Sequence, residues 1–302
     1  MIKPSSLQKG DRVAVIAPAG PPDREHLLQG QRVLEEMGLD VVIGKNVFNA
    51  EEDLAAAGEK RLADLHEAFS DPAIRGVFCA NGGFGSAKIA PMIDYEKLQS
   101  NPKIFWGYSD ITYLLNAIQQ FSDLVTFHGP MVASDLNDEQ ITKETASSFA
   151  PLFTGESIIY DSHTSRLQTI AHGTGEGPLA GGNLTLLTSG LGTPYQVKSK
   201  GSILLIEEVA EPAFRVDLML THLKQAGVFD EVQGVVLGNF QADPDEHFKI
   251  RKVLQNFFAH ARFPVVENFL FGHCQPNYGV PLGVEATLTT SPPQLLIDSG
   301  VQ

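Results

Sequence analysis

Cysteine, positive charge and long apolar runs are all scarce in this sequence, and each scarcity excludes a class of protein. Cys79 and Cys274 are its two cysteines, too few for a disulfide framework. The 22 lysines and arginines are outnumbered by 36 aspartates and glutamates, and the formal net charge is −14, so we expect neither nucleic acid nor an anionic membrane surface as a partner. No apolar run approaches the roughly 20 residues that cross a bilayer, and residues 1–6 contain no apolar signal core, so we expect a cytoplasmic protein.

Apolar segments alternate with helical ones through the first half of the 302 residues, a length that suits two domains. The pattern predicts strands at 12–17, 41–43, 76–80, 104–107 and 125–128, and helices at 23–37 and 58–69. Apolar strands joined by helices indicate a parallel sheet covered on both faces. We therefore expect a doubly wound α/β domain over residues 1–135, with ligands at the carboxyl ends of its strands.

The second half of the chain has a different pattern. Residues 136–176 are more polar and weakly periodic, and we interpret them as a connector. Beyond them the sequence predicts strands at 202–206, 234–238, 264–266, 286–288 and 294–297, and helices at 213–226 and 248–261. This order indicates a smaller C-terminal α/β or α+β domain over residues 177–302.

Ser109 follows the apolar run 104–107 and precedes residues 110–120, which have helical spacing. The order predicts a serine on a tight strand-to-helix turn, with its hydroxyl exposed above a sheet and backbone N–H groups beside it. A nucleophile elbow has this geometry, although the second glycine of the usual G-x-S-x-G pattern is missing here. A serine that only caps the following helix is the alternative interpretation.

A glycine-rich loop, Asn81-Gly82-Gly83-Phe84-Gly85-Ser86, follows another predicted strand. Three glycines in four positions allow backbone N–H groups to approach an anion closely, either a phosphate or an oxyanion. A phosphate-binding loop would continue with a lysine and then a serine or threonine, and this loop does not. Nucleotide binding is therefore disfavoured, while a tight turn without a ligand remains the structural alternative.

Two later positions supply a carboxylate and an imidazole. Glu207 lies where a predicted apolar strand meets a loop, and no histidine stands near it at a metal-ligand spacing. A charged residue that merely ends a strand is the alternative for this position. His273 lies in a loop between small and turn-forming residues. The adjacent Cys274 is a weaker candidate nucleophile than Ser109, and Cys79, inside an apolar strand, is predicted to belong to the core.

A serine, a histidine and a carboxylate together indicate nucleophilic catalysis. A serine hydroxyl is a weak nucleophile at neutral pH, so it needs an imidazole to accept its proton and a carboxylate to orient that imidazole. Ser109, His273 and Glu207 offer these three groups. The backbone N–H groups of Asp110 and Gly83 offer the two donors that a tetrahedral intermediate requires. Sequence spacing does not establish that these groups meet, because the histidine and the carboxylate come from the second predicted domain.

Seven motifs, taken in order, resemble the serine LD-carboxypeptidase family, which comprises murein tetrapeptide carboxypeptidases and microcin-immunity peptidases. Each motif is weak alone, but the ordered set is specific and extends over nearly the whole chain. The motifs are 10–20, 82–85, 107–110, 127–131, 181–184 with 192–194, 206–208 with 212–217, and 272–273 with 281–283.

The resemblance implies a role for particular residues of this sequence. Ser109 matches the nucleophile, His273 the general base, Glu207 its carboxylate partner, and the backbone amides of Gly83 and Asp110 the oxyanion hole. It further implies a cytoplasmic enzyme, typically a homodimer, that needs no metal or cofactor. Such an enzyme hydrolyses the amide between the L-centre of a diamino acid and a terminal D-alanine in murein tetrapeptides, the small peptide substrate of cell-wall recycling.

The sequence departs from the family pattern in three places. Asn81 and Phe84 flank the first glycines of the loop where arginine and tyrosine are common, and Lys88 stands where arginine is frequent. Leu218 replaces a second arginine that often follows the Arg-x-Asp pattern beginning at Arg215. Arginine and lysine bind carboxylates differently, so these changes concern substrate recognition. The candidate substrate-binding residues are Gly82, Phe84, Lys88 and Arg215.

Three functional hypotheses therefore stand. The first is a serine peptidase that removes the terminal D-alanine of murein tetrapeptides. The second is a microcin-immunity-type peptidase, which would cleave an aminoacyl-nucleotide amide with the same triad. The third is a protein that binds anionic peptides at the glycine-rich loop without catalysis.

Overall fold

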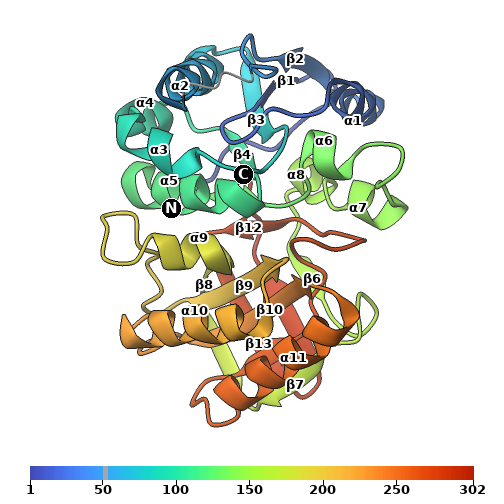
Figure 1. Ribbon diagram of the computed structural model, residues 1–302. Coiled ribbons are helices and arrows are strands. Elements are labelled where there is room, and N and C mark those ends of the chain that lie inside the picture. Colours follow the sequence, from blue (N-terminus) through green and yellow to red (C-terminus); the bar gives the residue numbers. More distant parts are fainter. Residues whose placement is uncertain (50–53) are drawn as a thin grey trace. The chain divides into compact units, whose positions relative to one another are not determined.

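Residues 1–49 and 54–302 are described in the computed structural model, and they fall into two units (Figure 1). Unit 1 contains Met1–Gly155, Gln275–Pro281 and Gly300–Gln302, and unit 2 contains Glu156–Cys274 and Leu282–Ser299. Of the stretch 136–176, interpreted above as a connector, the part up to Gly155 packs with unit 1 and the remainder with unit 2. The chain returns to unit 1 directly after Cys274.

Unit 1 is built on a six-stranded sheet. Its strands are β1 (Arg12–Ile16), β2 (Asp40–Ile43), β3 (Ile74–Cys79), β4 (Ile104–Gly107), β5 (Thr126–His128) and β12 (Val280–Leu282), in the spatial order β12-β5-β4-β3-β1-β2. The first five strands pair in parallel, which confirms the predicted parallel sheet. Its helices are α1 (Arg24–Glu36), α2 (Leu54–Ser70), α3 (Ser86–Ile89), η1 (Ala90–Met92), α4 (Tyr95–Ser100), η2 (Ser109–Ile111), α5 (Thr112–Ser122), α6 (Val132–Asp135), α7 (Lys143–Ser147) and α8 (Pro151–Thr154).

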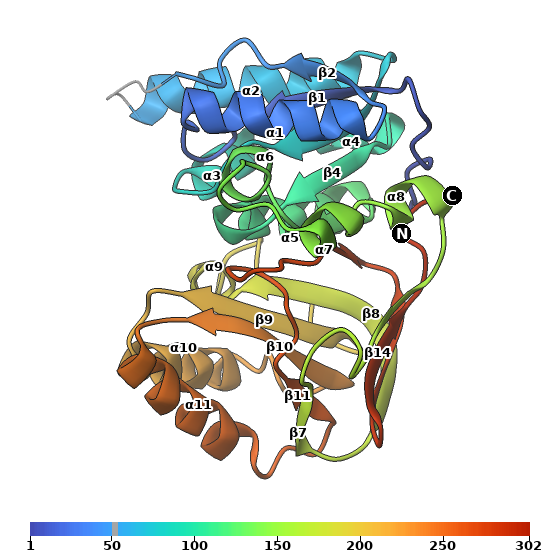
Figure 2. The same cartoon turned by 90° about the vertical axis from the view of Figure 1, so that its right-hand side faces the viewer.

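The helices of unit 1 pack closely because their contact faces are apolar or lack a side chain. Helix α1 begins after Asp23, whose carboxylate accepts hydrogen bonds from the main-chain N–H groups of Glu25 and His26, and it buries Leu27 and Gly30. A Cβ atom on Gly30 would lie 1.9 Å from the carbonyl oxygen of Val132, so glycine is what lets α1 lie directly against α6 (Figure 2).

The order of strands in unit 1 reverses between β1 and β3, since β2 lies outside β1 and β4 lies outside β3. At such a point the loops after the two central strands diverge and leave a crevice at their carboxyl ends. The loop after β1 meets the glycine-rich loop after β3 there, because the N–H of Gly20 donates to the carbonyl oxygen of Gly82 at 2.8 Å. The glycine-rich loop thus begins where doubly wound sheets bind ligands.

Unit 2 is built on a mixed eight-stranded sheet. Its strands are β6 (Ile158–Tyr160), β7 (Gln168–Ala171), β8 (Thr174–Asn183), β9 (Ile203–Val209), β10 (Gly234–Gln241), β11 (Val265–Glu267), β13 (Glu285–Thr290) and β14 (Pro293–Ile297), in the spatial order β6-β14-β13-β8-β9-β10-β11-β7. Strands β8 to β11 pair in parallel, and the flanking strands pair antiparallel. Helices α9 (Leu184–Ser189), α10 (Ala213–Gln225) and α11 (Pro244–Phe258) complete the unit.

The core of unit 2 lies between its sheet and two of these helices. Helices α10 and α11 lie side by side along one face of the sheet (Figure 2). Val216 and Leu220 of α10 and Leu254 of α11 pack against the parallel strands in one apolar cluster. The two helices therefore cover one face of the parallel strands, and Glu207 lies within β9 itself.

Strand β8 was not predicted, and neither were β6 and β7 within the expected connector. Glycine weakens the strand signal in a sequence, and β8 has glycines where neighbouring backbone leaves no room. A Cβ atom on Gly175 would lie 1.9 Å from the carbonyl oxygen of Gln233, and one on Gly181 would lie 2.1 Å from that of Leu205. The glycines allow β8 to pack closely, and their low strand propensity is the reason that the sequence does not predict this strand.

Candidate active site

Ser109 lies on the turn between β4 and α5, as the sequence predicts. Strand β4 is buried along its length, and Gly107 at its end has no space for a side chain, since a Cβ atom would lie 3.0 Å from that of Cys79. Ser109 itself has a φ of 61°, a left-handed conformation that costs a non-glycine residue about 1–3 kcal/mol. An N-cap residue has extended backbone, so this conformation is that of an elbow and not of a simple cap.

The glycine-rich loop lies directly beside Ser109. A Cβ atom on Gly82 would lie 3.1 Å from both Cβ and Oγ of Ser109, so any larger residue would press on the hydroxyl-bearing side chain. Gly83 follows with a φ of 110°, a conformation that favours glycine. The structure therefore brings together the predicted nucleophile and the predicted oxyanion loop within unit 1.

The loop is joined to the turn by the side chain of Asp110. The carboxylate Oδ2 accepts a hydrogen bond from the N–H of Ser86 at 2.9 Å, and the hydroxyl of Ser86 donates to the main-chain oxygen of Asp110 at 2.6 Å. Burial raises the pKa of Asp110, while hydrogen bonds from Ser86 and the nearby Arg61 act in the opposite direction. Arg61 donates from Nη1 to the carbonyl oxygen of Phe84 at 3.1 Å, and burial lowers the pKa of this guanidinium.

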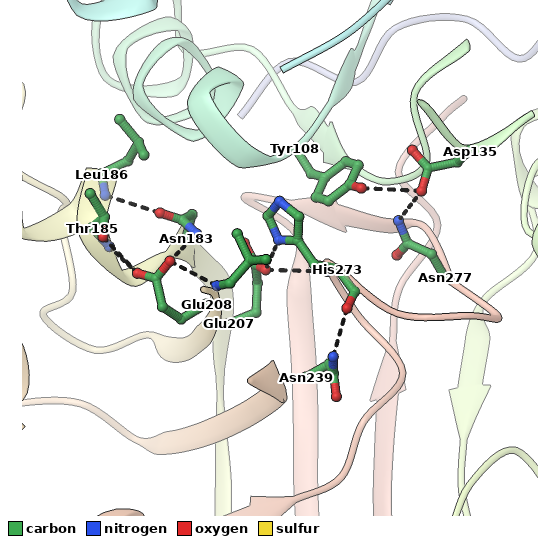
Figure 3. A network of polar contacts seen from close by, with 11 residues as sticks. Tyr108, Asp135, Asn183, Thr185, Leu186, Glu207, Glu208, Asn239, His273 and Asn277 are labelled. Atoms are coloured by element: carbon green, nitrogen blue, oxygen red, sulfur yellow. Dashed lines mark hydrogen bonds and ion pairs between the residues drawn. The ribbon is translucent and has the colours of Figure 1, made fainter. Parts of the chain in front are cut away.

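A second polar network involves Tyr108, the residue before the candidate nucleophile (Figure 3). Its hydroxyl donates to Oδ1 of the buried Asp135 at 3.1 Å, and Nδ2 of Asn277 donates to the same oxygen at 3.5 Å. The other oxygen of Asp135 accepts from the N–H of Met131 at 2.8 Å. Asn277 belongs to the segment Gln275–Pro281, so this network fixes the chain that follows His273 to unit 1.

Glu207 and His273 form a close pair within unit 2. Nδ1 of His273 lies 2.7 Å from Oε2 of Glu207, and the main-chain N–H of His273 donates to the same oxygen at 3.4 Å. The Glu207 side chain is 0% exposed and that of His273 is 16% exposed. A carboxylate that accepts from Nδ1 selects the tautomer in which Nε2 carries the lone pair, so the imidazole is oriented to accept a proton there.

Two glycines and one asparagine hold this pair in place. A Cβ atom on Gly272 would lie 2.2 Å from Oε2 of Glu207, and one on Gly238 would lie 3.0 Å from the Cβ of Glu207. The amide of Asn239, at the end of β10, donates to the main-chain oxygen of His273 at 2.6 Å (Figure 3). The histidine loop is therefore fixed from two neighbouring strands, because Glu207 of β9 and Asn239 of β10 both contact His273.

Glu208, next to Glu207, has a structural role. Its carboxylate accepts from Nδ2 of Asn183 at 3.1 Å, from the N–H and hydroxyl of Thr185 at 2.8 Å each, and from the N–H of Val209 at 2.8 Å (Figure 3). Burial raises its pKa, and these donors act against that shift. These contacts fix the start of α9 to the end of β9. The carboxylate of Glu208 is thus bound to the residues around α9, whereas that of Glu207 contacts His273.

Of the remaining candidate residues, Phe84 and Lys88 belong to unit 1 and Arg215 to unit 2. Phe84 is 60% exposed at the tip of the glycine-rich loop, with Nζ of Lys88 at 5.4 Å from its ring centroid. Arg215 lies in the first turn of α10, where it pairs with Glu211 at 3.5 Å. Cys79 is buried, as predicted, and burial raises its pKa, so its thiol stays neutral at physiological pH.

Sequence reasoning did not find Asp135, Asn277, Arg61 or Asn239. Asp135 and Asn277 are 142 positions apart, and no local pattern connects a buried carboxylate with its donor at such a separation. Asn239 carried a weak signal, because it directly follows the predicted strand 234–238, the position where a polar residue meets the edge of the sheet.

Within residues 1–49 and 54–302, no cluster of three or more histidine, cysteine, aspartate or glutamate side chains is arranged to hold a metal ion. None of the helices in those same ranges combines the length and the apolar composition of a membrane span.

Comparison with known proteins gives matches along the whole chain. Residues 13–129 match the LD-carboxypeptidase N-terminal domain, and residues 176–288 match the LD-carboxypeptidase C-terminal domain. A probable murein peptide carboxypeptidase of Bacillus subtilis (strain 168) is 41% identical over 303 residues, covering 99% of this chain and 95% of the relative.

Solved structures agree with these sequence matches. An MccF-like protein from Bacillus anthracis str. Ames superposes with a TM-score of 0.88 at 27% identity, covering 99% of this chain and all (100%) of that one. A muramoyltetrapeptide carboxypeptidase from Oxalobacter formigenes has a TM-score of 0.84 at 28% identity, covering 96% of this chain and 100% of that one.

Proposed function

Because the chain belongs to the LD-carboxypeptidase family, we propose that it is a serine peptidase that hydrolyses the L,D amide before the terminal D-alanine of murein tetrapeptides. The observation that carries the proposal is the left-handed turn at Ser109, with the glycine-rich loop beside it. A cap or a plain loop has no need of this strained backbone. The murein substrate rests on the name of the Bacillus subtilis relative.

The proposed reaction uses Ser109, His273 and Glu207 in sequence. Oγ of Ser109 attacks the carbonyl carbon while Nε2 of His273 takes its proton, and Glu207 balances the charge that forms on the imidazole. His273 then gives this proton to the amine of D-alanine, which leaves as the C–N bond breaks. Water attacks the resulting ester in a second round, with His273 taking its proton. The bond between the acyl carbon and Oγ breaks, His273 returns the proton to Oγ of Ser109, and the shortened peptide leaves as a carboxylate.

The N–H groups of Gly83 and Asp110 are proposed to stabilise the oxyanion of each tetrahedral intermediate. Two features of the structure support the scheme. The pair of Glu207 and His273 has the distance expected of an oriented general base. The chain passes from unit 2 to unit 1 one residue after His273, since Cys274 ends one segment and Gln275 begins the next.

Mass spectrometry of the reaction with L-Ala-D-Glu-meso-diaminopimelate-D-Ala, in the presence of EDTA, tests the proposal. We expect the wild type and a matched control, Ser100→Ala on the exposed face of α4, to release D-alanine. Ser109→Ala should release none, because the hydroxyl that forms the acyl-enzyme is missing. Turnover by Ser109→Ala at the wild-type rate would refute the assignment of the nucleophile.

The likeness to the MccF-like protein supports a second candidate, a peptidase for aminoacyl-nucleotide amides with the same triad. Cleavage of an aspartyl sulfamoyl adenosine without cleavage of the tetrapeptide would favour it. Tight binding of the tetrapeptide, with neither reaction and with no reaction of Ser109 towards a phosphonate, would instead favour a binding protein. A homodimer in the cytoplasm stays a prediction, and light scattering of the purified protein checks the dimer.

A further inference from the structure

Asp110 carries a buried carboxylate in addition to the main-chain N–H proposed for the oxyanion hole. The residue is 6% exposed. Its carboxylate accepts from the N–H of Ser86 at 2.9 Å, and a hydrogen bond from the N–H of Gly85 also favours the charged form. Because Ser86 donates its hydroxyl to the main-chain oxygen of Asp110 at 2.6 Å, the two residues are joined in both directions.

The glycine-rich loop needs such contacts from outside. Gly83 and Gly85 have φ values of 110° and 127°, and a run of glycines populates many conformations, so the loop does not fix its own shape. Its first end is held by the bond from Gly20 to the carbonyl oxygen of Gly82 at 2.8 Å. Its far end is held by the Asp110 carboxylate, and Gly83 lies between these two attachments.

Arg61 of helix α2 completes the far attachment. It donates to the carbonyl oxygen of Phe84 at 3.1 Å, and a Cβ atom on Gly85 would lie 2.4 Å from its Nη1. Its positive charge also favours the ionised form of Asp110. A carboxylate is costly to bury unless donors and an opposite charge surround it, and this one has both.

We propose that the carboxylate of Asp110 is the positioning group of the oxyanion hole, holding the glycine-rich loop so that the N–H of Gly83 stays aligned with the N–H of Asp110. The inference rests on the proposed function, in which those two donors stabilise the intermediate. One residue then supplies a donor from its main chain and sets the place of the second donor through its side chain. A purely structural role, completing the first turn of α3, is the alternative that the experiment must separate.

The experiment compares three variants for the rate at which a fluorophosphonate labels Ser109 and for the kcat and KM of tetrapeptide cleavage. Asp110→Asn keeps the shape but loses the charge and one acceptor, and we expect labelling and kcat to fall about 10²-fold with KM within about twofold. Ser86→Ala keeps the N–H bonded to the carboxylate, so its loss should be smaller. The control is Asp94→Asn, because Asp94 caps α4 through the N–H of Lys97, and it should react as the wild type does.

Binding of a peptide boronate, which forms a tetrahedral adduct, should weaken in Asp110→Asn as much as kcat falls, while binding of the product peptide should not change. A structural role alone would not separate these two ligands. The proposal would be overturned if the labelling rate and kcat of Asp110→Asn were within about twofold of those of Asp94→Asn. It would also be overturned if only KM changed, or if thermal melts showed that the fall in kcat matched a loss of folded protein.

Failure of the proposed function gives a different result. A wild type whose Ser109 is not labelled would refute both the nucleophile and the inference about Asp110. A wild type that is labelled but does not cleave the tetrapeptide would refute only the substrate, and the labelling rates of the two Asp→Asn variants would still decide the role of Asp110.

Discussion

Gly272 offers the sharpest test of the pair formed by Glu207 and His273. A Cβ atom on Gly272 would lie 2.2 Å from Oε2 of Glu207, whereas ordinary contacts between non-bonded atoms begin at about 3.4 Å. In Gly272→Ala the carboxylate must therefore retreat by about 1 Å. The other end of the same side chain lies close to the main chain of Gly238, since a Cβ atom there would lie 3.0 Å from the Cβ of Glu207.

The retreat breaks the contact that orients the imidazole. The Nδ1 to Oε2 distance is 2.7 Å, and a further 1 Å takes it beyond hydrogen-bonding range. A triad whose histidine loses its carboxylate loses about 10⁴-fold in kcat in serine peptidases, so we expect Gly272→Ala to lose roughly 10³–10⁴-fold. Because the φ of 91° at Gly272 disfavours a residue with a side chain, alanine there should also lower the free energy of unfolding by about 1–2 kcal/mol.

Gly201→Ala is the matched control because it carries the backbone penalty without the clash. Gly201 lies in the same unit with a φ of 73°, and a Cβ atom there would meet no atom within 4 Å. Steady-state cleavage of the tetrapeptide and urea unfolding of both variants measure the two effects separately. A kcat of Gly272→Ala within about tenfold of that of Gly201→Ala would refute the proposed dependence of catalysis on this pair.

Two single side chains, the half-buried Asn239 and the buried Lys103, give further predictions. Asn239→Ala removes the hydrogen bond to the main-chain oxygen of His273, so kcat should fall about tenfold and the free energy of unfolding by about 1 kcal/mol. The control is Asn256→Ala, because Asn256 is exposed on α11. Equal values of kcat in the two variants would contradict the prediction. Burial lowers the pKa of Lys103 to about 8, below its usual value of about 10.4, so between these pH values the unfolded chain binds a proton that the folded chain has released. The free energy of unfolding of the wild type, measured in urea relative to that of Lys103→Met, should therefore rise over that pH interval. A difference between the two proteins that does not change with pH would show that the pKa of Lys103 is not lowered.

The local parts of the site were predictable because their signals lie within a few residues. The turn at Ser109 was predicted from an apolar run, a serine and a segment with helical spacing. The structure has β4, η2 and α5 in the same order. Glu207 was placed at the end of an apolar strand, and β9 continues through it to Val209. The periodicity of the chain changes at Ser109, which makes that strand end predictable, whereas the strand end predicted at Glu207 came two residues too early.

The distant parts were not predictable, for two physical reasons. Buried polar pairs such as Asp135 with Asn277 depend on how remote segments pack, and each residue alone resembles a surface residue in sequence. Strand β8 was missed because close packing requires glycine at Gly175 and Gly181, and glycine is the residue that strand patterns exclude. The same packing also explains why part of the expected connector belongs to unit 2.

Glycines lie beside the candidate catalytic residues as well as in the strand that the sequence did not predict. Gly82 would press on Ser109 if it had a side chain, and Gly272 would press on Glu207. Reactive groups must be approached by substrate and by backbone donors, so the main chain next to them has to come closer than a Cβ atom allows. A glycine beside a reactive side chain is thus a sign of close approach, as Gly82 is for Ser109 in unit 1 and Gly272 is for Glu207 in unit 2. The arrangement predicts that substitutions at these glycines reduce turnover through the geometry of the reactive side chains, whereas alanine at Gly201 changes stability alone.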